Sequence, residues 1–253
     1  MDTITFIQSD PLKDKIVNYW QSRSKSFSEL HQRALHDSIA ERWYAEIAPE
    51  LKTDEKAPCD FKILDIGCGT GFFSILTAKK GFNVTGIDLT PAMIRESRKN
   101  AVKEKVDVIF LKMDAEYPTL QENSFDLLIT RNLTWTLPHL EDAYANWFKL
   151  LKSDGTLLNF DGDYHSLSQS CHDRLPESHA HNHLSREQNK ACEEIYRRLP
   201  QDTKPYIDVA LMRKAGFRDI LVDMDLSKRI YTDIDDYYNP VPMFRLRAKK
   251  PIN

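Results

Sequence analysis

The chain has 253 residues, of which 41% are hydrophobic and 29% are charged, and its formal net charge is −3. This length suits one large domain or two small ones, and the composition excludes wholesale disorder. A slightly acidic balance also excludes the broad basic surface that drives nucleic-acid binding. We therefore expect a globular protein without a nucleic-acid partner.

The cysteines and the apolar segments indicate the cellular compartment in which the protein is expected. The four cysteines contain no CxxC pair, which indicates a reduced, intracellular chain. No apolar run reaches the roughly 18–20 residues of a membrane span. The first residues lack the basic segment and apolar stretch of a secretory signal. We expect a cytoplasmic protein with no membrane partner, and the sequence leaves its oligomeric state open.

The first expected part, residues 1–55, repeats apolar residues at helical spacing and predicts an N-terminal helical cap. The second part, residues 56–161 with 205–253, alternates short apolar runs with amphipathic stretches. This rhythm is typical of an α/β domain with a largely parallel sheet. Strands are expected at 61–66, 82–88, 106–112, 125–130 and 156–161, and helices at 72–80, 91–104 and 139–151.

The third expected part, residues 162–204, is polar and holds five of the eight histidines. We expect it to be an inserted lid with one or two helices, the clearest at 185–198. After it we expect a helix at 205–215 and two strands near 218–228 and 242–248. Little chain separates these strands, so they are expected to be antiparallel, which makes the sheet mixed.

Glycine supplies the sharpest signal, since only eight occur in the chain and three of them are Gly67, Gly69 and Gly71. They follow the apolar residues 63–66 and precede a helical stretch. A glycine turn between a buried strand and a helix lets backbone N–H groups approach a ligand. The third glycine comes one residue earlier than in the G-x-G-x-x-G turn that holds a dinucleotide pyrophosphate.

Two acidic residues end the next two expected strands. Asp88 follows VTGI and Asp114 follows FLKM. The carboxyl ends of parallel strands open onto one crevice, so these carboxylates and the glycine turn converge on one nucleoside-sized ligand. Asp88 could accept both ribose hydroxyls, and Asp114 could accept from an adenine amino group. The alternatives without ligand binding are that Asp88 is a helix N-cap and that Asp114 is an acidic residue on the surface.

The order and spacing of five segments resemble the class I S-adenosylmethionine-dependent methyltransferases over residues 60–161. The segments are DIGCGTG, GIDLTPAMI, FLKMDAE, FDLLITRN and LLKSDGTLLNFD. NYWQSRSKSF near residue 20 is similar to the opening of small-molecule members, such as the ubiquinone and menaquinone biosynthesis methyltransferases. LKSDG replaces the family's usual LKPGG, but Gly155 is kept.

The resemblance implies a Rossmann-like α/β fold with a seven-stranded mixed sheet, its last strand antiparallel, and helices on both faces. It implies S-adenosylmethionine as cofactor and S-adenosylhomocysteine as product. The cofactor site would be formed by Tyr19, Arg23, Asp65, Gly67, Cys68, Gly69, Gly71, Asp88, Leu89, Met93, Met113, Asp114, Ala115 and Arg131.

The sequence indicates the residues that would bind the methyl acceptor less clearly than those of the cofactor site. Asn132, Trp135 and Tyr164 are candidates for the acceptor wall, and Asn132, Asp161 and His139 are candidates for catalytic roles. A base is needed only if the acceptor must lose a proton. Trp135 could also be a core residue, but its polar neighbours and its place after the fourth strand favour the acceptor wall.

Other candidates also keep two interpretations. Asp65 could be a turn residue, and Cys68 is more easily a small filler than a nucleophile, because no base is identifiable nearby. The aromatic residues around Tyr19 could form a helical core face with Arg23 in solvent. Alternatively, they could close over a sulfonium by cation–π contact while Arg23 pairs with the cofactor's carboxylate.

The histidines at 179, 181 and 183 suggest a metal site, but their spacing does not match the usual ligand spacings, and we expect no metal. The predicted function is methyl transfer to a small-molecule acceptor. The alternatives are a protein or peptide methyltransferase, a non-catalytic S-adenosylmethionine-binding regulatory protein, and a nicotinamide-dependent oxidoreductase.

Overall fold

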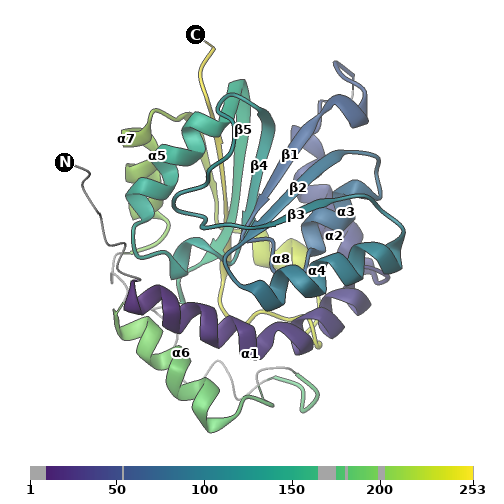
Figure 1. Ribbon diagram of the computed structural model, residues 1–253, viewed down its shortest axis with the longest axis vertical. Coiled ribbons are helices and arrows are strands. Elements are labelled where there is room, and N and C mark those ends of the chain that lie inside the picture. The colour runs from purple at the N-terminus through teal and green to yellow at the C-terminus, as the bar shows by residue number, and fades with distance from the viewer. Residues whose placement is uncertain (1–9, 53, 165–174, 180–181, 199–202, 253) are drawn as a thin grey trace, which may run out of the picture.

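A seven-stranded mixed sheet organises the chain, with strand order β3-β2-β1-β4-β5-β7-β6 (Figure 1). The computed structural model describes residues 10–52, 54–164, 175–179, 182–198 and 203–252. β1 to β5 are parallel, and β7 runs antiparallel to both β5 and β6. The expected mixed sheet with a reversed last strand is therefore confirmed.

The strands are β1 (Lys62–Ile66), β2 (Asn83–Asp88), β3 (Ile109–Lys112), β4 (Phe125–Arg131), β5 (Leu151–Gly162), β6 (Arg218–Asp223) and β7 (Met243–Lys249). The α-helices are α1 (Pro11–Ala34), α2 (Ser38–Ile47), α3 (Phe72–Ala78), α4 (Pro91–Glu104), α5 (Leu140–Leu150), α6 (Arg186–Arg198), α7 (Tyr206–Ala215) and α8 (Leu226–Ile230). Short 3₁₀ turns include Thr134–Thr136.

Local sequence explains where the longest helices begin and end. The Asp10 side chain accepts from the Leu12 N–H, and Pro11 occupies the first position of α1. Pro91 likewise starts α4, which ends at Lys105 in the left-handed conformation. An N-cap acceptor and a proline at the first turn both satisfy the geometry of a helix start.

Successive side chains of the central strands point to opposite faces of the sheet. Ile63 of β1 packs with α2 and α3, whereas Leu64 packs with α5 and α7. Each face therefore has its own apolar core. The alternation fixes which strand residues can reach the carboxyl edge of the sheet.

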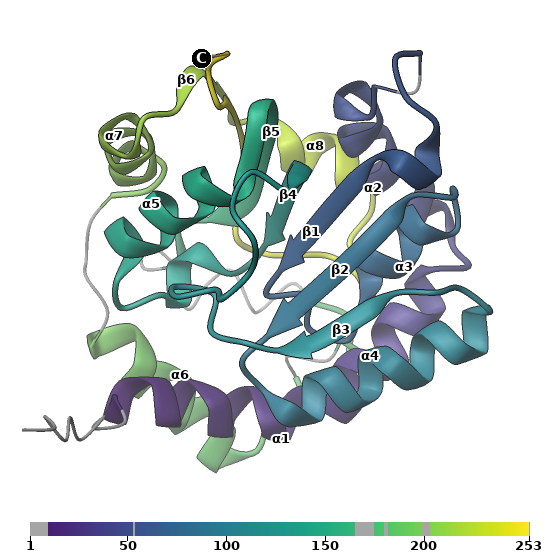
Figure 2. The same ribbon diagram turned by 45° about the horizontal axis from the view of Figure 1, so that its top comes forward.

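Helix α1 lies across the carboxyl ends of the parallel strands, and α6 packs against it (Figures 1 and 2). A separate apolar cluster joins Tyr19 of α1 to Ile195 of α6 and to Trp135. The segments expected to form a cap and a lid thus meet over one end of the sheet. The three-part domain division stays a prediction.

Two element boundaries differ most from the sequence expectation. β5 begins at Leu151 rather than residue 156, because Leu151 pairs with Phe125 across a register shift. The strand expected near 218–228 ends at Asp223 and is followed by α8. Leu226 and Ile230 of α8 are fully buried, and their i, i+4 spacing places both on one helix face.

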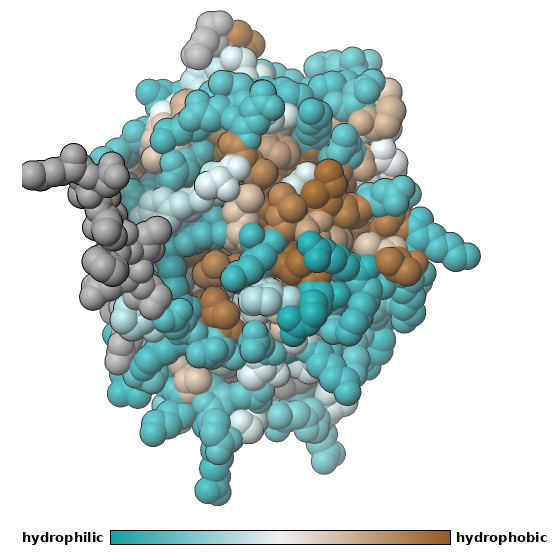
Figure 3. Space-filling view, viewed as in Figure 1, coloured by the Kyte–Doolittle hydropathy of each residue, from teal (hydrophilic) through white to brown (hydrophobic). Residues whose placement is uncertain are grey.

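Hydrophobic residues gather over β2 and β3 on the face seen in Figure 3, and hydrophilic residues surround them. Ile109 of the edge strand β3 is 57% exposed. No helix among the described residues is long and apolar enough to span a membrane.

Candidate functional site

The glycine turn after β1 leaves space beside its backbone. Gly67 and Gly69 have φ angles of +68° and +53°, which side chains rarely adopt. A Cβ on Gly67 would lie 2.8 Å from Leu133, but a Cβ on Gly69 would meet no protein atom within 4 Å. Gly69 therefore presents its backbone to an open cavity, where a ligand can approach closely.

Asp88 stands beside this turn at the end of β2. Its Oδ2 accepts from the Gly69 N–H at 3.0 Å, and its Oδ1 accepts from the Thr90 N–H at 2.7 Å. Burial raises the pKa of Asp88. An ionised carboxylate offers about four lone-pair sites. Each oxygen of Asp88 can therefore accept one more hydrogen bond from a ligand that carries paired hydroxyls.

Asp65 and Cys68 are buried at the base of the turn. The Asp65 carboxylate accepts from the Ser74 N–H at 2.9 Å and from its hydroxyl at 2.5 Å, and burial raises the Asp65 pKa to about 6. Burial and the two nearby aspartates raise the pKa of the Cys68 thiol well above its ordinary value. A protonated thiol is a poor nucleophile, which favours the interpretation of Cys68 as a small filler.

Asp114 lies just beyond β3 and is tied to the first helix. The Lys13 ammonium donates to Asp114 Oδ2 at 2.6 Å and also pairs with the fully buried Glu116. Asp114 Oδ1 accepts from the Glu116 N–H at 2.9 Å. The N-terminal end of α1 is thereby fixed to the third strand end.

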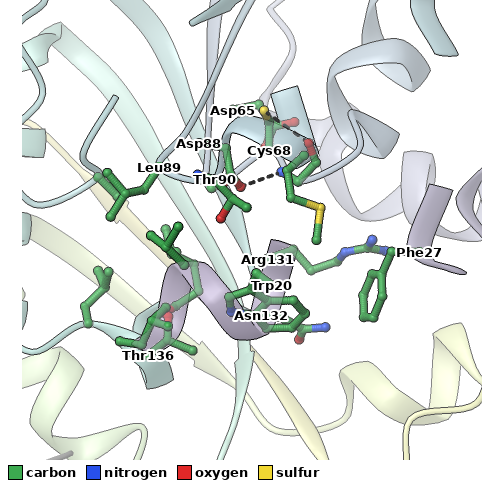
Figure 4. A pocket seen from close by; sticks show the side chains of 18 of the residues that line it. Trp20, Phe27, Asp65, Cys68, Asp88, Leu89, Thr90, Arg131, Asn132 and Thr136 are labelled. Atoms are coloured by element: carbon green, nitrogen blue, oxygen red, sulfur yellow. Dashed lines mark hydrogen bonds between the residues drawn. The ribbon is translucent and has the colours of Figure 1, made fainter. Parts of the chain in front are cut away.

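These groups line a cavity of about 120 Å³ that reaches from the strand ends to α1 (Figure 4). The predicted cofactor residues that line it are Asp65, Gly67, Cys68, Gly69, Asp88, Leu89, Met93, Asp114, Ala115 and Arg131. Lys13, Trp20, Phe27 and His31 cover the same cavity from α1. The strand ends and the glycine turn are thus brought together as expected.

Arg131 and His31 form a hydrogen-bonded pair between the sheet and α1. Arg131 Nη2 donates to His31 Nε2 at 2.9 Å, so His31 Nδ1 carries the proton and donates to Thr70 Oγ1 at 2.7 Å. Burial, and then the charge of Arg131, lower the His31 pKa well below its ordinary value. The Arg131 guanidinium also lies 4.8 Å from the Phe72 ring centroid. A neutral His31 therefore orients a buried cation.

A second cavity of about 1140 Å³ lies next to the first, between α1, α6 and the segment 231–241. The two cavities share a wall, since six residues line both. These are Trp20, Phe27, His31, Phe72, Arg131 and Asn132. A ligand in either cavity would contact the same side chains.

The predicted acceptor residues lie in this second cavity. Tyr164 Oη donates to Asn132 Oδ1 at 2.9 Å and accepts from the Asn239 side chain at 2.9 Å. The Trp135 and Tyr164 rings lie 4.8 Å apart at an angle of 30°. Trp135 Nε1 donates to the Asn132 carbonyl at 3.1 Å. Asn132 is thus held rigidly, and its Nδ2 donates to no described residue.

Two of the three catalytic candidates lie away from both described cavities. Asp161 is fully buried and accepts from the Thr134 hydroxyl and, at 3.0 Å, from the Trp135 N–H. His139 precedes α5 and contacts Glu116 Oε2 at 3.0 Å. Asp161 holds the turn that bears Trp135, and His139 is exposed just before α5. Their geometry therefore gives no support to a catalytic role, whereas Asn132 lines both cavities.

Four predicted cofactor residues also lie outside the smaller cavity as the structure describes it. Tyr19 and Arg23 line the larger cavity instead. Gly71 begins α3 and faces Phe110 and Ser97, and Met113 packs into the core beneath the sheet.

Sequence reasoning missed Lys13 and His31. His31 lies four residues after Phe27, which lies four after Arg23, so all three share one face of α1. That spacing was a usable signal for His31. The sequence held no such signal for Lys13, because its partners Asp114 and Glu116 are about a hundred residues away in the chain.

The structure describes only part of the histidine-rich segment 179–183. His179 Nε2 donates to the Tyr238 carbonyl at 2.9 Å, and His181 lies outside the described residues. No group of three or more metal-ligating side chains occurs among the residues that the structure describes. The expectation that no metal is needed stays a prediction.

The fold and the glycine turn with Asp88 at the next strand end define a Rossmann-like nucleoside-binding protein. Residues 63–155 match a family model described as "Methyltransferase domain". An aklanonic acid methyltransferase of Streptomyces sp. (strain C5) is 35% identical over 126 residues, which cover 48% of this chain and 57% of that protein. Residues 63–155 therefore carry a methyltransferase domain, which resembles the class I S-adenosylmethionine-dependent methyltransferases, whose cofactor is S-adenosylmethionine.

Two further proteins are similar to this chain, one in sequence and one in fold. A ubiquinone biosynthesis O-methyltransferase of Coxiella burnetii is 30% identical over 95 residues, which cover 38% of this chain and 41% of that protein. The solved structure of a methyltransferase from Aquifex aeolicus shares the fold at a TM-score of 0.58 and 15% identity, covering 91% of this chain and 98% of that one. The chain spans about half the length of the curated relatives it matches.

Proposed function

We propose that the protein transfers a methyl group from S-adenosylmethionine to a small-molecule acceptor. The observation that supports this most directly is the wall shared by the two cavities. The smaller cavity has the glycine turn and the strand-end carboxylates, and the larger one adjoins it at Arg131 and Asn132. A methyl donor and an acceptor held in these cavities would meet at the shared wall.

The residues of the smaller cavity fit the cofactor. Gly69 leaves its backbone face open, and each Asp88 oxygen keeps an acceptor site for one ribose hydroxyl. Asp114 stands at the neighbouring strand end, where it could accept from the adenine amino group while Lys13 covers it. Met93 and Ala115 supply apolar contacts for the base. When bound, S-adenosylmethionine supplies an electrophilic methyl group on its sulfonium.

The chain's task in such a reaction is to position the acceptor. Holding a nucleophile in line with the electrophilic carbon at about 3–3.5 Å can supply roughly 7–11 kcal/mol of the barrier reduction. Asn132 is suited to this because its Oδ1 is fixed by Tyr164 and its Nδ2 is left to a ligand. Trp20 and Trp135 flank it and exclude water, and their ring centroids lie 6.5 Å apart.

A small molecule fits the larger cavity better than a protein side chain does. Residues from α1, from α6 and from segment 231–241 line it on several sides. The names of the aklanonic acid and ubiquinone methyltransferases also indicate small acceptors for those proteins. These observations favour a small-molecule acceptor and leave its identity open.

Calorimetric titration with S-adenosylhomocysteine tests the proposal. Each hydrogen bond to a charged group is worth about 1.5–3 kcal/mol, so Asp88→Asn should weaken binding roughly 10- to 1,000-fold after partial replacement by water. The exposed Asp107 supplies the control variant Asp107→Asn, which should bind like the wild type. Failure of the wild type to bind, or an unchanged affinity in folded Asp88→Asn, would contradict the assignment.

A further inference from the structure

Arg23 is a buried cation without a counter-ion among the described residues. It lies in the middle of α1 with 5% of its surface exposed, and its buried Nε has no hydrogen-bond partner. It forms no salt bridge with a described residue. The ionisable groups that influence it are the Tyr19 phenol and the Cys192 thiol, and neither is a carboxylate.

Such an arrangement is unfavourable in the ligand-free protein. A guanidinium stays protonated in proteins, so burial does not neutralise it. Buried charges are ordinarily paired or hydrogen-bonded, because removing them from water has a large free-energy cost. Phe27 offers partial compensation, since its ring centroid lies 5.3 Å from the Arg23 guanidinium carbon. The donors of Arg23 form no hydrogen bond with a described residue, so they can bind a ligand.

The position of Arg23 indicates which ligand that is. Arg23 lines the larger cavity, whereas the smaller cavity has Arg131 beside the glycine turn. Arg131 is therefore the better placed cation for a carboxylate on the cofactor. Arg23 faces the space assigned above to the acceptor.

No buried carboxylate among the described lining residues offsets the charge of Arg23. Glu193 is exposed, and Asp236 already pairs with Arg33 at 3.1 Å and with the Ser178 hydroxyl. His31 donates to Thr70 and accepts from Arg131, so it carries no negative charge. The larger cavity therefore presents net positive charge to its ligand.

The rest of the cavity wall is aromatic. Trp20 lies 5.1 Å from Tyr19, 5.3 Å from Phe27 and 6.5 Å from Trp135, measured between ring centroids. Trp135 in turn stacks near Tyr164. Offset and edge-to-face contacts of this kind suit a flat aromatic ligand. The volume of about 1140 Å³ exceeds the roughly 300–1,000 Å³ of ordinary ligand pockets, which leaves room for several fused or linked rings.

We propose that the methyl acceptor is an aromatic acid, and that Arg23 binds its anionic group through the forked guanidinium donors. This inference rests on the proposed function, because it assigns the larger cavity to the acceptor. A carboxylate, a sulfonate and a phosphate each present two neighbouring oxygen atoms, which a guanidinium can bind in bidentate fashion.

Two fluorescent probes that differ in one charged group test the proposal. 8-Anilinonaphthalene-1-sulfonate carries an anion, and N-phenyl-1-naphthylamine has the same rings without it. Both are titrated into protein saturated with S-adenosylhomocysteine. The wild type should bind the sulfonate at least about tenfold more tightly than the neutral probe, as expected for a charge-assisted hydrogen-bond pair.

Variants then locate the preference. Arg23→Gln should reduce it to about twofold while leaving the neutral probe's affinity unchanged, and Arg23→Lys should restore part of it. Arg33→Gln, on the same helix but largely exposed, should retain the wild-type preference. Equal affinity of the wild type for the two probes, no binding of either, or an undiminished preference in Arg23→Gln would overturn the proposal.

A parallel titration with S-adenosylhomocysteine separates this inference from the proposed function. Arg23→Gln should bind it within about threefold of the wild type, because Arg23 does not line the smaller cavity. A loss greater than about tenfold would place Arg23 at the cofactor's carboxylate and overturn the assignment to the acceptor, while the methyltransferase function would stand. Only failure of the wild type to bind S-adenosylhomocysteine would contradict that function.

Discussion

His31 Nε2 lies 2.9 Å from Arg131 Nη2, and this hydrogen bond connects the first helix to the end of the fourth strand. Because an arginine only donates, the imidazole must keep Nε2 unprotonated. His31 is therefore a poor candidate for a general base, although it stands at the wall between the two cavities. Its contact fixes the direction of the Arg131 guanidinium instead.

The buried, neutral His31 should make the protein less stable in mild acid. Its folded-state pKa lies well below 6.5, so the unfolded chain binds a proton first as the pH falls below about 6.5. The free energy of unfolding should therefore decrease with acidification over this range. Urea denaturation between pH 7.5 and 5 should show a smaller decrease in His31→Gln than in the wild type. The exposed His36 supplies the control His36→Gln, and an identical pH dependence in all three proteins would refute the prediction.

Asp161 should have the opposite effect. Burial raises its pKa from 3.8 to about 6, so the folded protein takes up a proton before the unfolded chain does. The ionised carboxylate thus lowers stability above pH 6, and that loss is regained as the pH falls from 6 towards 3.8. Relative to Asp161→Asn, the wild type should gain on the order of 2 kcal/mol between pH 7 and 4, at 1.36 kcal/mol per pKa unit. Urea midpoints measured at each pH give this difference, with Asp107→Asn as control. A difference that does not change with pH would show that Asp161 titrates normally.

Gly69→Ala should impair cofactor binding more than stability. The residue has a φ of +53°, and its added methyl group would enter the open space of the smaller cavity. The left-handed conformation costs a non-glycine residue roughly 1–2 kcal/mol. Gly81 has a φ of +90° and lies away from the described cavities, so Gly81→Ala is a matched control for the backbone strain. Both variants should melt lower, but only Gly69→Ala should lose S-adenosylhomocysteine affinity, by tenfold or more. Similar affinities in the two variants would place the cofactor elsewhere.

Asn132→Ala and Trp135→Ala should reduce turnover far more than cofactor affinity. Trp135 lines the larger cavity, and Asn132 lies at the shared wall with an Nδ2 that donates to no described residue. Turnover is measured as S-adenosylhomocysteine release with an acceptor found by screening aromatic acids. We expect at least a tenfold decrease for each variant, with the calorimetric affinity for S-adenosylhomocysteine within about threefold. Wild-type turnover with a collapsed affinity would assign these residues to the cofactor site.

The strand-end groups could be predicted from the sequence because parallel strands place their carboxyl ends at one edge. The order of the strands along the chain was enough to predict that Asp65, Asp88 and Asp114 lie near one another. Asp161 was wrongly expected at the cavity although its strand was found. The pleat turns it towards Thr134, and a shift of one residue along a strand reverses the face of a side chain.

The contacts of α1 were harder to predict for a different reason. Helical spacing groups Arg23, Phe27 and His31 on one face, but it does not say which distant residues that face meets. The partners of His31 are Thr70 and Arg131, and the docking angle of the helix decides both contacts. The contact of Lys13 with Asp114 is fixed in the same way.

The shared wall makes the two cavities depend on one helix. Three of its six residues, Trp20, Phe27 and His31, belong to α1, so any tilt of this helix changes both cavities at once. Thermodynamic linkage then makes the coupling reciprocal. If the first ligand changes the affinity for the second by some factor, the second ligand changes the affinity for the first by the same factor. Occupancy by the spent nucleoside product would accordingly tighten or loosen the hold on the methylated acceptor. On the proposed function, the affinities for both products would thus depend on the position of this one helix, which Lys13 ties to Asp114.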